Sequence, residues 1–86
     1  MTHISCEVSL YPFVKDEPFE PIRTFIKSVK ESGLSIHTGP MSSHIEGDLE
    51  KVFDVLKGTF GDACESGPVV MVMKVSNTCP PWHEPK

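Results

Sequence analysis

Four histidines and three cysteines are the side chains of this 86-residue chain best suited to metal binding or nucleophilic chemistry. They are His3, His37, His44, His83, Cys6, Cys64 and Cys79. None forms a closely spaced pair such as C-x-x-C or H-x-x-x-H, so structural zinc is weakly supported. His37 and His44 could meet across a hairpin, but surface histidines are the simpler explanation. We therefore expect no metal site.

Covalent catalysis is also weakly supported. The chain contains no G-x-S-x-G motif and no glycine-rich phosphate loop. Cys6 falls in a predicted core strand and Cys79 in a tail, and no histidine is tied to a cysteine by spacing. We expect no catalytic residue and a protein that is not an enzyme.

Small polar side chains gather where strands are expected to end. They are Ser9, Tyr11, Thr38, Ser42, Ser43, Ser76 and Asn77. With a carboxylate from Glu7 or Glu46, they could hydrogen-bond the edge of a polar heteroaromatic ring, while Tyr11 or Met41 stacks on its face. The same residue types also favour strand ends and turns for purely structural reasons. The residues alone leave both interpretations open.

The elements that must position these groups are organised around residues 34–48, LSIHTGPMSSHIEGD. Apolar and polar residues alternate over 34–38, Gly39-Pro40 breaks the run, and a second extended segment follows over 41–46. This pattern predicts a hairpin whose second strand leads directly into a helix.

Four further elements are predicted from hydrophobic periodicity and from the residues that begin or end helices and strands. Residues 4–11 and 69–75 are predicted strands, and residues 21–32 form a helix that ends at Gly33. A second helix runs from Leu49 to about Phe60 with Asp48 as its N-cap, and Gly61-Asp62 either ends it or leaves a frayed turn to Cys64. The apolar face of this second helix is expected to consist of Leu49, Val52, Phe53, Leu56 and Phe60.

The order strand–helix–strand–strand–helix–strand predicts an α+β fold. Its compact solution is the ferredoxin-like βαββαβ sandwich, a four-stranded antiparallel sheet of order 4-1-3-2 with both helices on one face. We expect a single ligand-binding domain over residues 1–80 and a proline-rich tail over residues 81–86.

Alternation along the strands divides the sheet into two faces. The face under the helices is expected to hold Cys6, Val8, Leu10, Leu34, Ile36, Ile45, Val70 and Val72. The open face is expected to hold Glu7, Ser9, Tyr11, His37, His44 and Glu46, with Val69, Met71, Met73 and Val75. Because contiguous apolar patches are seldom left in water, we predict a homodimer or a dimer of dimers that covers part of the open face. A partly solvated sheet is the alternative.

Composition excludes several classes of partner. The formal charge of −4 argues against a nucleic-acid binder, and no apolar run approaches the roughly 20 residues that span a bilayer. The N-terminus does not resemble a signal peptide, so reduced thiols and a cytoplasmic location are expected.

Three segments of the chain resemble the YkoF-like thiamine/hydroxymethylpyrimidine-binding family: ISCEVSLYPF, GPMSSHIEGD and VVMVMKVSNTCP. The S-L-Y-P and S-N-x-C-P elements are the more specific, whereas I-E-G-D is shared with a wider group of small thiamine-binding proteins. The resemblance implies a non-enzymatic binder of thiamine or its pyrimidine moiety, without a cofactor, that serves thiamine salvage, transport or sensing. It also implies a possible thiamine transport system as partner. Some members carry two repeats in one chain, so a pair of these single-repeat chains would supply the second.

The resemblance carries over to Ser9 and Tyr11, Ser43 beside Met41, and Ser76-Asn77. With Glu7 and Thr38, which the residue pattern supplies, the predicted ligand-binding set is Glu7, Ser9, Tyr11, Thr38, Met41, Ser43 and Asn77. Glu7 departs from the family pattern, and the ending PPWHEPK does not map onto it. Thr38 and Ser43 belong to the helix-covered face, whereas Glu7, Ser9 and Tyr11 belong to the open face. The two groups can share a pocket only near a strand end or across a subunit boundary. A metal or redox sensor and a protein-interaction module that uses the open face are the alternative functions.

Overall fold

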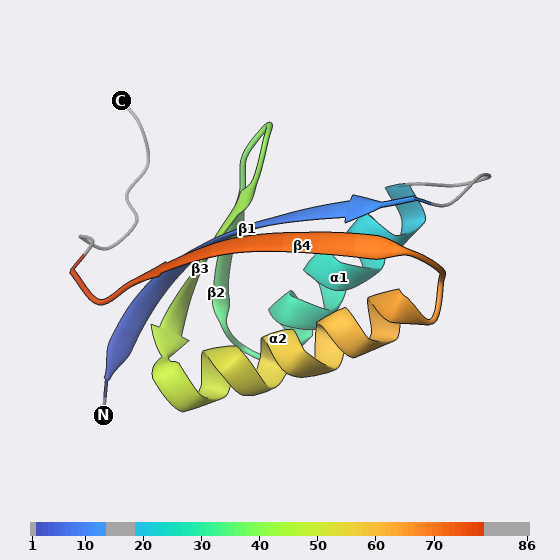
Figure 1. The fold of residues 1–86 in the computed structure, drawn as a ribbon. Coiled ribbons are helices and arrows are strands. Elements are labelled where there is room, and N and C mark those ends of the chain that lie inside the picture. The colour runs from blue at the N-terminus through green and yellow to red at the C-terminus, as the bar shows by residue number, and fades with distance from the viewer. Residues whose placement is uncertain (1, 14–18, 79–86) are drawn as a thin grey trace.

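The computed structural model describes residues 2–13 and 19–78. Its elements are β1 (His3–Pro12), α1 (Phe19–Glu31), β2 (Ser35–Thr38), β3 (Ser43–Asp48), α2 (Leu49–Cys64) and β4 (Val69–Ser76). Both helices cover the same face of the sheet (Figure 1). The predicted tail, residues 81–86, lies outside the described residues.

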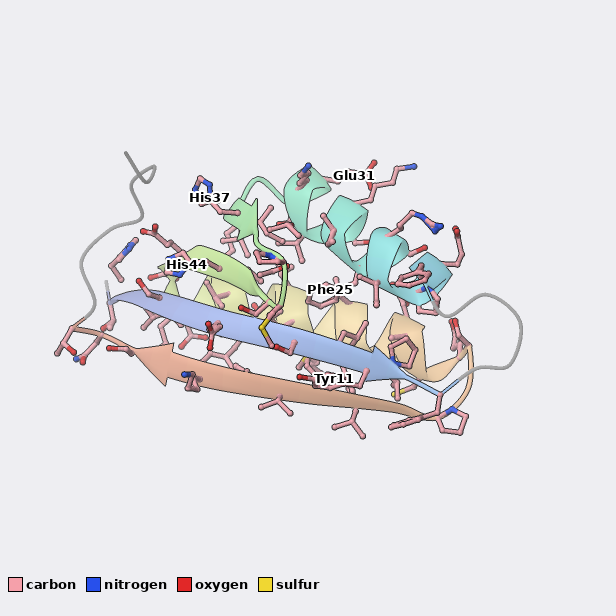
Figure 2. All side chains as sticks on the ribbon, turned by 90° about the horizontal axis from the view of Figure 1, so that it is seen from above. Tyr11, Phe25, Glu31, His37 and His44 are labelled. Atoms are coloured by element: carbon pink, nitrogen blue, oxygen red, sulfur yellow. The ribbon has the colours of Figure 1, made fainter. Side chains whose placement is uncertain are left out.

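The sheet has the order β2-β3-β1-β4, and each neighbouring pair is antiparallel. This is the ferredoxin-like sandwich predicted from the order of elements. The central pair β1–β3 places Cys6 opposite Ile45, and both are almost fully buried. Val29 of α1 and Val52 and Leu56 of α2 complete the centre of the core. Phe25 lies between α1 and the sheet (Figure 2).

Both helices begin and end for identifiable reasons. Pro21 is accommodated in the first turn of α1, where its missing N–H needs no partner, and Gly33 follows the helix with a φ of 90°. The predicted N-cap of α2 is confirmed, because Asp48 Oδ2 accepts a hydrogen bond from the Lys51 N–H at 3.4 Å.

Of the two ends predicted for α2, the structure has the longer one, as regular helix, and part of the predicted buried face is wrong. The helix continues past Gly58 and Gly61 to Cys64, since Thr59 and Ala63 are buried and their packing offsets the low helix propensity of glycine. The buried residues are Val52, Leu56, Thr59 and Ala63, whereas Phe53 is 45% exposed.

The predicted facing of β4 is also wrong, by one residue. In the register with β1, Val8 lies opposite Met73 and Leu10 opposite Met71, so both methionines pack against the core. Val70 and Val72 face the open side, opposite Tyr11 and Ser9. The expected open-face patch of Met71 and Met73 is therefore replaced by one of Val70, Val72 and Tyr11.

Among the described residues, no helix has the length and apolar character needed to cross a membrane.

Candidate ligand-binding site

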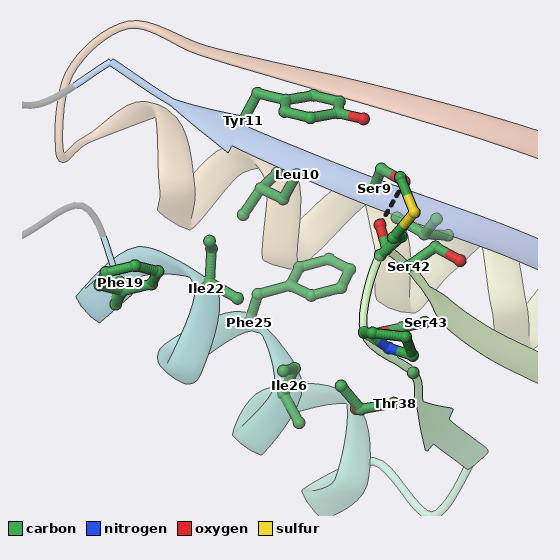
Figure 3. Close-up of a pocket in the computed structure, with 14 residues that line it drawn as sticks. Ser9, Leu10, Tyr11, Phe19, Ile22, Phe25, Ile26, Thr38, Ser42 and Ser43 are labelled. Atoms are coloured by element: carbon green, nitrogen blue, oxygen red, sulfur yellow. Dashed lines mark hydrogen bonds between the residues drawn. The ribbon is translucent and has the colours of Figure 1, made fainter.

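A gap in the sheet lies beside the C-terminal half of β1. The backbone pairing of β1 with β3 ends at Val8 and Ser43, but β1 continues through Pro12 in contact with β4. The turn over residues 39–42 and the helix α1 enclose the space that β3 no longer fills (Figure 3). Because the gap is open at the edge of β1, residues of both sheet faces can reach it.

The gap forms a cavity of about 240 Å³. It is lined by Val8, Ser9, Leu10, Tyr11, Phe19, Ile22, Phe25, Ile26, Thr38, Gly39, Pro40, Met41, Ser42 and Ser43. Leu10 and the α1 residues Ile22, Phe25 and Ile26 form an apolar wall, whereas Tyr11 lies on the other side of β1 from Leu10 (Figure 3). Apolar walls with a few hydroxyl groups are typical of pockets that hold small organic ligands.

The turn that closes the cavity is held in three ways. The Gly39 N–H donates to the Ser42 carbonyl at 2.8 Å, which closes the turn on itself. The Ser9 hydroxyl donates to the Met41 carbonyl at 3.4 Å, and the Ser42 hydroxyl donates to Glu7 Oε2 at 3.1 Å. These two side-chain hydrogen bonds join β1 to the turn beyond the last backbone pair.

Five of the seven predicted ligand-binding residues line this one cavity. They are Ser9, Tyr11, Thr38, Met41 and Ser43. Ser9 and Tyr11 from the open-face group thus meet Thr38 and Ser43 from the helix-covered group near a strand end, which is one of the two arrangements that alternation allowed. Their part in ligand binding stays a prediction.

The other two predicted residues lie elsewhere. Glu7 lines a second hollow on the open face, and exposed Asn77 follows β4 and lines neither hollow. Beside Asn77, the Ser76 hydroxyl accepts a hydrogen bond from the Thr78 N–H at 3.0 Å, so Ser76 has a local role in ending β4.

The open-face hollow has a volume of about 420 Å³ and a mixed charge. It is lined by Ser5, Cys6, Glu7, His44, Lys74, Val75 and Ser76. Glu7 Oε1 lies 3.2 Å from Lys74 Nζ. The hydrogen bonds from Lys74 and then from Ser42 lower the pKa of the Glu7 carboxyl below its ordinary value.

Two histidines of the open face, His3 and His44, contact the Glu46 carboxylate. Glu46 Oε2 lies 3.4 Å from His3 Nε2, and Glu46 Oε1 lies 3.3 Å from His44 Nε2. His37 lies opposite His44 in the register of β2 with β3. Within residues 2–13 and 19–78, no three His, Cys, Asp or Glu side chains form a group that could hold a metal ion.

The apolar wall was missing from the predicted site. Ile22, Phe25 and Ile26 were recognisable as the apolar face of a helix, but Phe19 lay before the predicted helix start. The sequence signal for this wall was the group of apolar residues in the first half of α1. They line the space beside β1 that β3 does not fill.

A protein-family model described as the YKOF-related family matches residues 3–81. The chain belongs to the YkoF-related family. Its cavity therefore lies within the part of the chain that the family model covers. A comparison with curated protein sequences finds no match.

Solved structures share the fold of this YkoF-related chain. A protein of Streptococcus pneumoniae is 17% identical with a TM-score of 0.81, over 86% of this chain and 84% of that one. A Methanocaldococcus jannaschii protein is 23% identical with a TM-score of 0.82, over 95% and 87%. A Thermotoga maritima protein with a proposed role in thiamine biosynthesis or salvage is 20% identical with a TM-score of 0.78, over 85% and 81%.

Proposed function

We propose that this chain is a non-enzymatic binding protein for thiamine or its hydroxymethylpyrimidine moiety, and that it serves thiamine salvage, transport or sensing. The observation that carries the proposal is the cavity beside the end of the β1–β3 pairing, in a member of the YkoF-related family. The role proposed for the similar Thermotoga maritima protein supports the choice of ligand.

The size and lining of the cavity fit one heteroaromatic ring. Its volume of about 240 Å³ is below the roughly 300–1,000 Å³ of most small-molecule pockets, so the rest of a larger ligand would lie at the mouth. Leu10 and Phe25 supply apolar surface for the ring faces, and the hydroxyls of Thr38 and Ser43 are suited to its nitrogen and amino groups.

A binding role without catalysis is supported by the chemistry of the walls. The residues that line the cavity in the described part of the chain include no histidine, cysteine, lysine or acidic residue. General acid–base catalysis usually depends on such side chains, and a serine hydroxyl needs one of them as a base before it can act as a nucleophile.

We propose further that the protein acts as a homodimer, or a dimer of dimers, in the cytoplasm. On the open sheet face, Val70 lies opposite Tyr11 and Val72 opposite Ser9, and Val70, Val72 and Tyr11 are each about half exposed. Covering this patch with a second copy would remove apolar surface from water. The patch adjoins the cavity, because Tyr11 belongs to both.

Thermal unfolding with added ligand tests the proposed function. Thiamine, thiamine diphosphate and hydroxymethylpyrimidine are added separately to the untagged protein. The cognate ligand should raise the melting temperature progressively, because binding at 100 times Kd stabilises the native state by about 2.7 kcal/mol. If none of the three changes the melting temperature, the proposed ligand class is wrong.

Two buried serines provide a matched pair of variants. Ser43 and Ser5 are 6% and 5% exposed, and both lie in the β1–β3 pair, but Ser43 lines the cavity and Ser5 the open-face hollow. Ser43→Ala should weaken ligand binding about tenfold, the effect of one lost hydrogen bond in a buried site. Ser5→Ala should leave Kd unchanged, and the reverse result would move the site to the open face.

A further inference from the structure

We propose that Glu7 is a positioning residue of the cavity, which holds the turn over residues 39–42 in place by joining it to β4. The inference rests on the proposed function, since it assigns Glu7 an effect on the affinity of the same cavity. It differs from the sequence-based expectation that Glu7 contacts the ligand.

The two oxygens of the Glu7 carboxylate have different partners. Oε2 accepts the hydrogen bond of the Ser42 hydroxyl at 3.1 Å, and Oε1 lies 3.2 Å from Lys74 Nζ. Ser42 lines the cavity, whereas Glu7 and Lys74 line the hollow on the open face. The carboxylate therefore reaches the cavity only through the turn.

The turn is closed by backbone pairing between β2 and β3, but the hydrogen bonds described between it and β1 come from side chains. Backbone pairing of β1 with β3 ends at Val8 and Ser43, one residue from Ser42. The other side-chain hydrogen bond from β1, between the Ser9 hydroxyl and the Met41 carbonyl, is longer at 3.4 Å and joins neutral groups. Hydrogen bonds to a carboxylate are shorter and stronger, so the bond from Ser42 contributes more.

Lys74 is the second partner of the carboxylate. Lys74 lies directly opposite Glu7 in the register of β1 with β4, and its ammonium group keeps the carboxylate ionised. The side chains of Glu7 and Lys74 are 49% and 81% exposed, and ion pairs of this kind add little to global stability. Their effect should therefore appear in the turn and not in the unfolding of the whole domain.

Four single variants and the double variant of Glu7→Ala with Ser42→Ala separate positioning from direct contact. Glu7→Ala removes both interactions of the carboxylate. Ser42→Ala removes only its hydrogen bond with the turn, and Lys74→Met removes only its ion pair with β4. Glu7→Gln keeps an acceptor for the Ser42 hydroxyl but loses the charge. Kd for thiamine and for hydroxymethylpyrimidine is measured by calorimetry, and amide hydrogen exchange of the turn is measured without ligand.

Positioning predicts a definite pattern. Glu7→Ala and Ser42→Ala should each weaken binding about three- to tenfold, and the double variant should be no worse than either, because both remove the same bond. Glu7→Gln should recover most of the affinity, and Lys74→Met should have a smaller effect than Glu7→Ala. The turn amides should exchange faster in Glu7→Ala and Ser42→Ala at an almost unchanged melting temperature.

Two results would overturn the proposal. Unchanged exchange of the turn in Glu7→Ala would mean that the carboxylate does not hold it. A loss in Glu7→Ala much larger than in Ser42→Ala, with additive effects in the double variant, would mean that Glu7 contacts the ligand directly. If the wild-type protein binds neither probe, the proposed function fails, and the exchange data still decide whether Glu7 holds the turn.

Discussion

Cys6 and Cys64 show how strongly the surroundings of a side chain govern its reactivity. Cys6 is buried on the helix-covered face of β1, whereas Cys64 is exposed at the end of α2. Burial raises the pKa of the Cys6 thiol to about 11. Because the thiolate is the reactive form, Cys6 is expected to be inert at neutral pH.

Alkylation of the native protein should therefore modify Cys64 much faster than Cys6. Iodoacetamide is added near neutral pH and each cysteine is followed by peptide mass spectrometry, so that the thiols are resolved individually. In denaturant the two rates should become similar, which serves as the control. Equal rates in the native protein would contradict the burial of Cys6.

The raised pKa also has a consequence for stability. The folded state favours the protonated Cys6 thiol. The stabilisation that this gives the fold is complete below the ordinary thiol pKa and declines as the pH rises toward about 11.

The sequence could indicate that Cys6 is buried, from the alternation of β1. It could not indicate the bond between Ser42 and Glu7, because that bond depends on how the turn docks against β1.

At the level of elements, β4 shows where sequence patterns are insufficient. Its residues VVMVMKV are apolar at nearly every position, so alternation alone does not select a face. Lys74 was the one polar marker, and it faces the open side opposite Glu7, which places Val70 and Val72 on that side too. In β1, where polar and apolar residues alternate strictly, the predicted faces are confirmed.

The hairpin and the helix after it could be predicted because the sequence marks both the turn, with Gly39-Pro40, and the helix start, with Asp48. The turn at Gly39-Pro40 and the cap at Asp48 lie where the sequence indicates, but the second strand runs over Ser43–Asp48 and not over the predicted 41–46, because the turn takes up Met41 and Ser42. The cavity could be expected only as a strand-end site. Its position depends on β1 being longer than its partner β3, and the lengths of two strands far apart in the sequence are not encoded in either pattern alone.

Gly47 of β3 is required because α2 and the chain before β2 approach it closely. An added Cβ would lie 2.6 Å from Leu34 Cδ2 and 3.3 Å from Val52 Cγ2, and both side chains are buried. Gly47→Ala should therefore lower the free energy of unfolding by about 1–3 kcal/mol, the usual effect of overpacking. Urea denaturation measures the change.

Gly58 is the matched control for this substitution. It lies within α2, and an added Cβ would meet nothing within 4 Å. Gly58→Ala should raise the free energy of unfolding by up to about 1 kcal/mol, because alanine favours helix more than glycine does. Equal effects of the two substitutions would contradict the close packing assigned to Gly47.

At the scale of the whole molecule, the two faces of the sheet have different environments. One is covered by α1 and α2, and the other bears the exposed patch of Val70, Val72 and Tyr11 beside a polar region around Glu7, His44 and Lys74. In a dimer formed through this face, the apolar patch would supply most of the driving force and the charged groups would restrict the orientation of the partner.

Val72→Lys tests this assembly, because a cation at the centre of the patch would face its symmetry mate or lose its hydration. Sedimentation velocity should give a dimer for the wild-type protein and a monomer for the variant. The variant should remain folded, since Val72 is 52% exposed and lysine is common on natural edge strands.

Phe53→Lys is the control: Phe53 is 45% exposed on α2, away from the open face, so this variant should remain a dimer. A monomeric wild-type protein, or a dimeric Val72→Lys variant, would place the interface elsewhere or remove it. Because Tyr11 belongs to both the patch and the cavity, dissociation of the dimer should also weaken ligand binding, which links assembly to the proposed function.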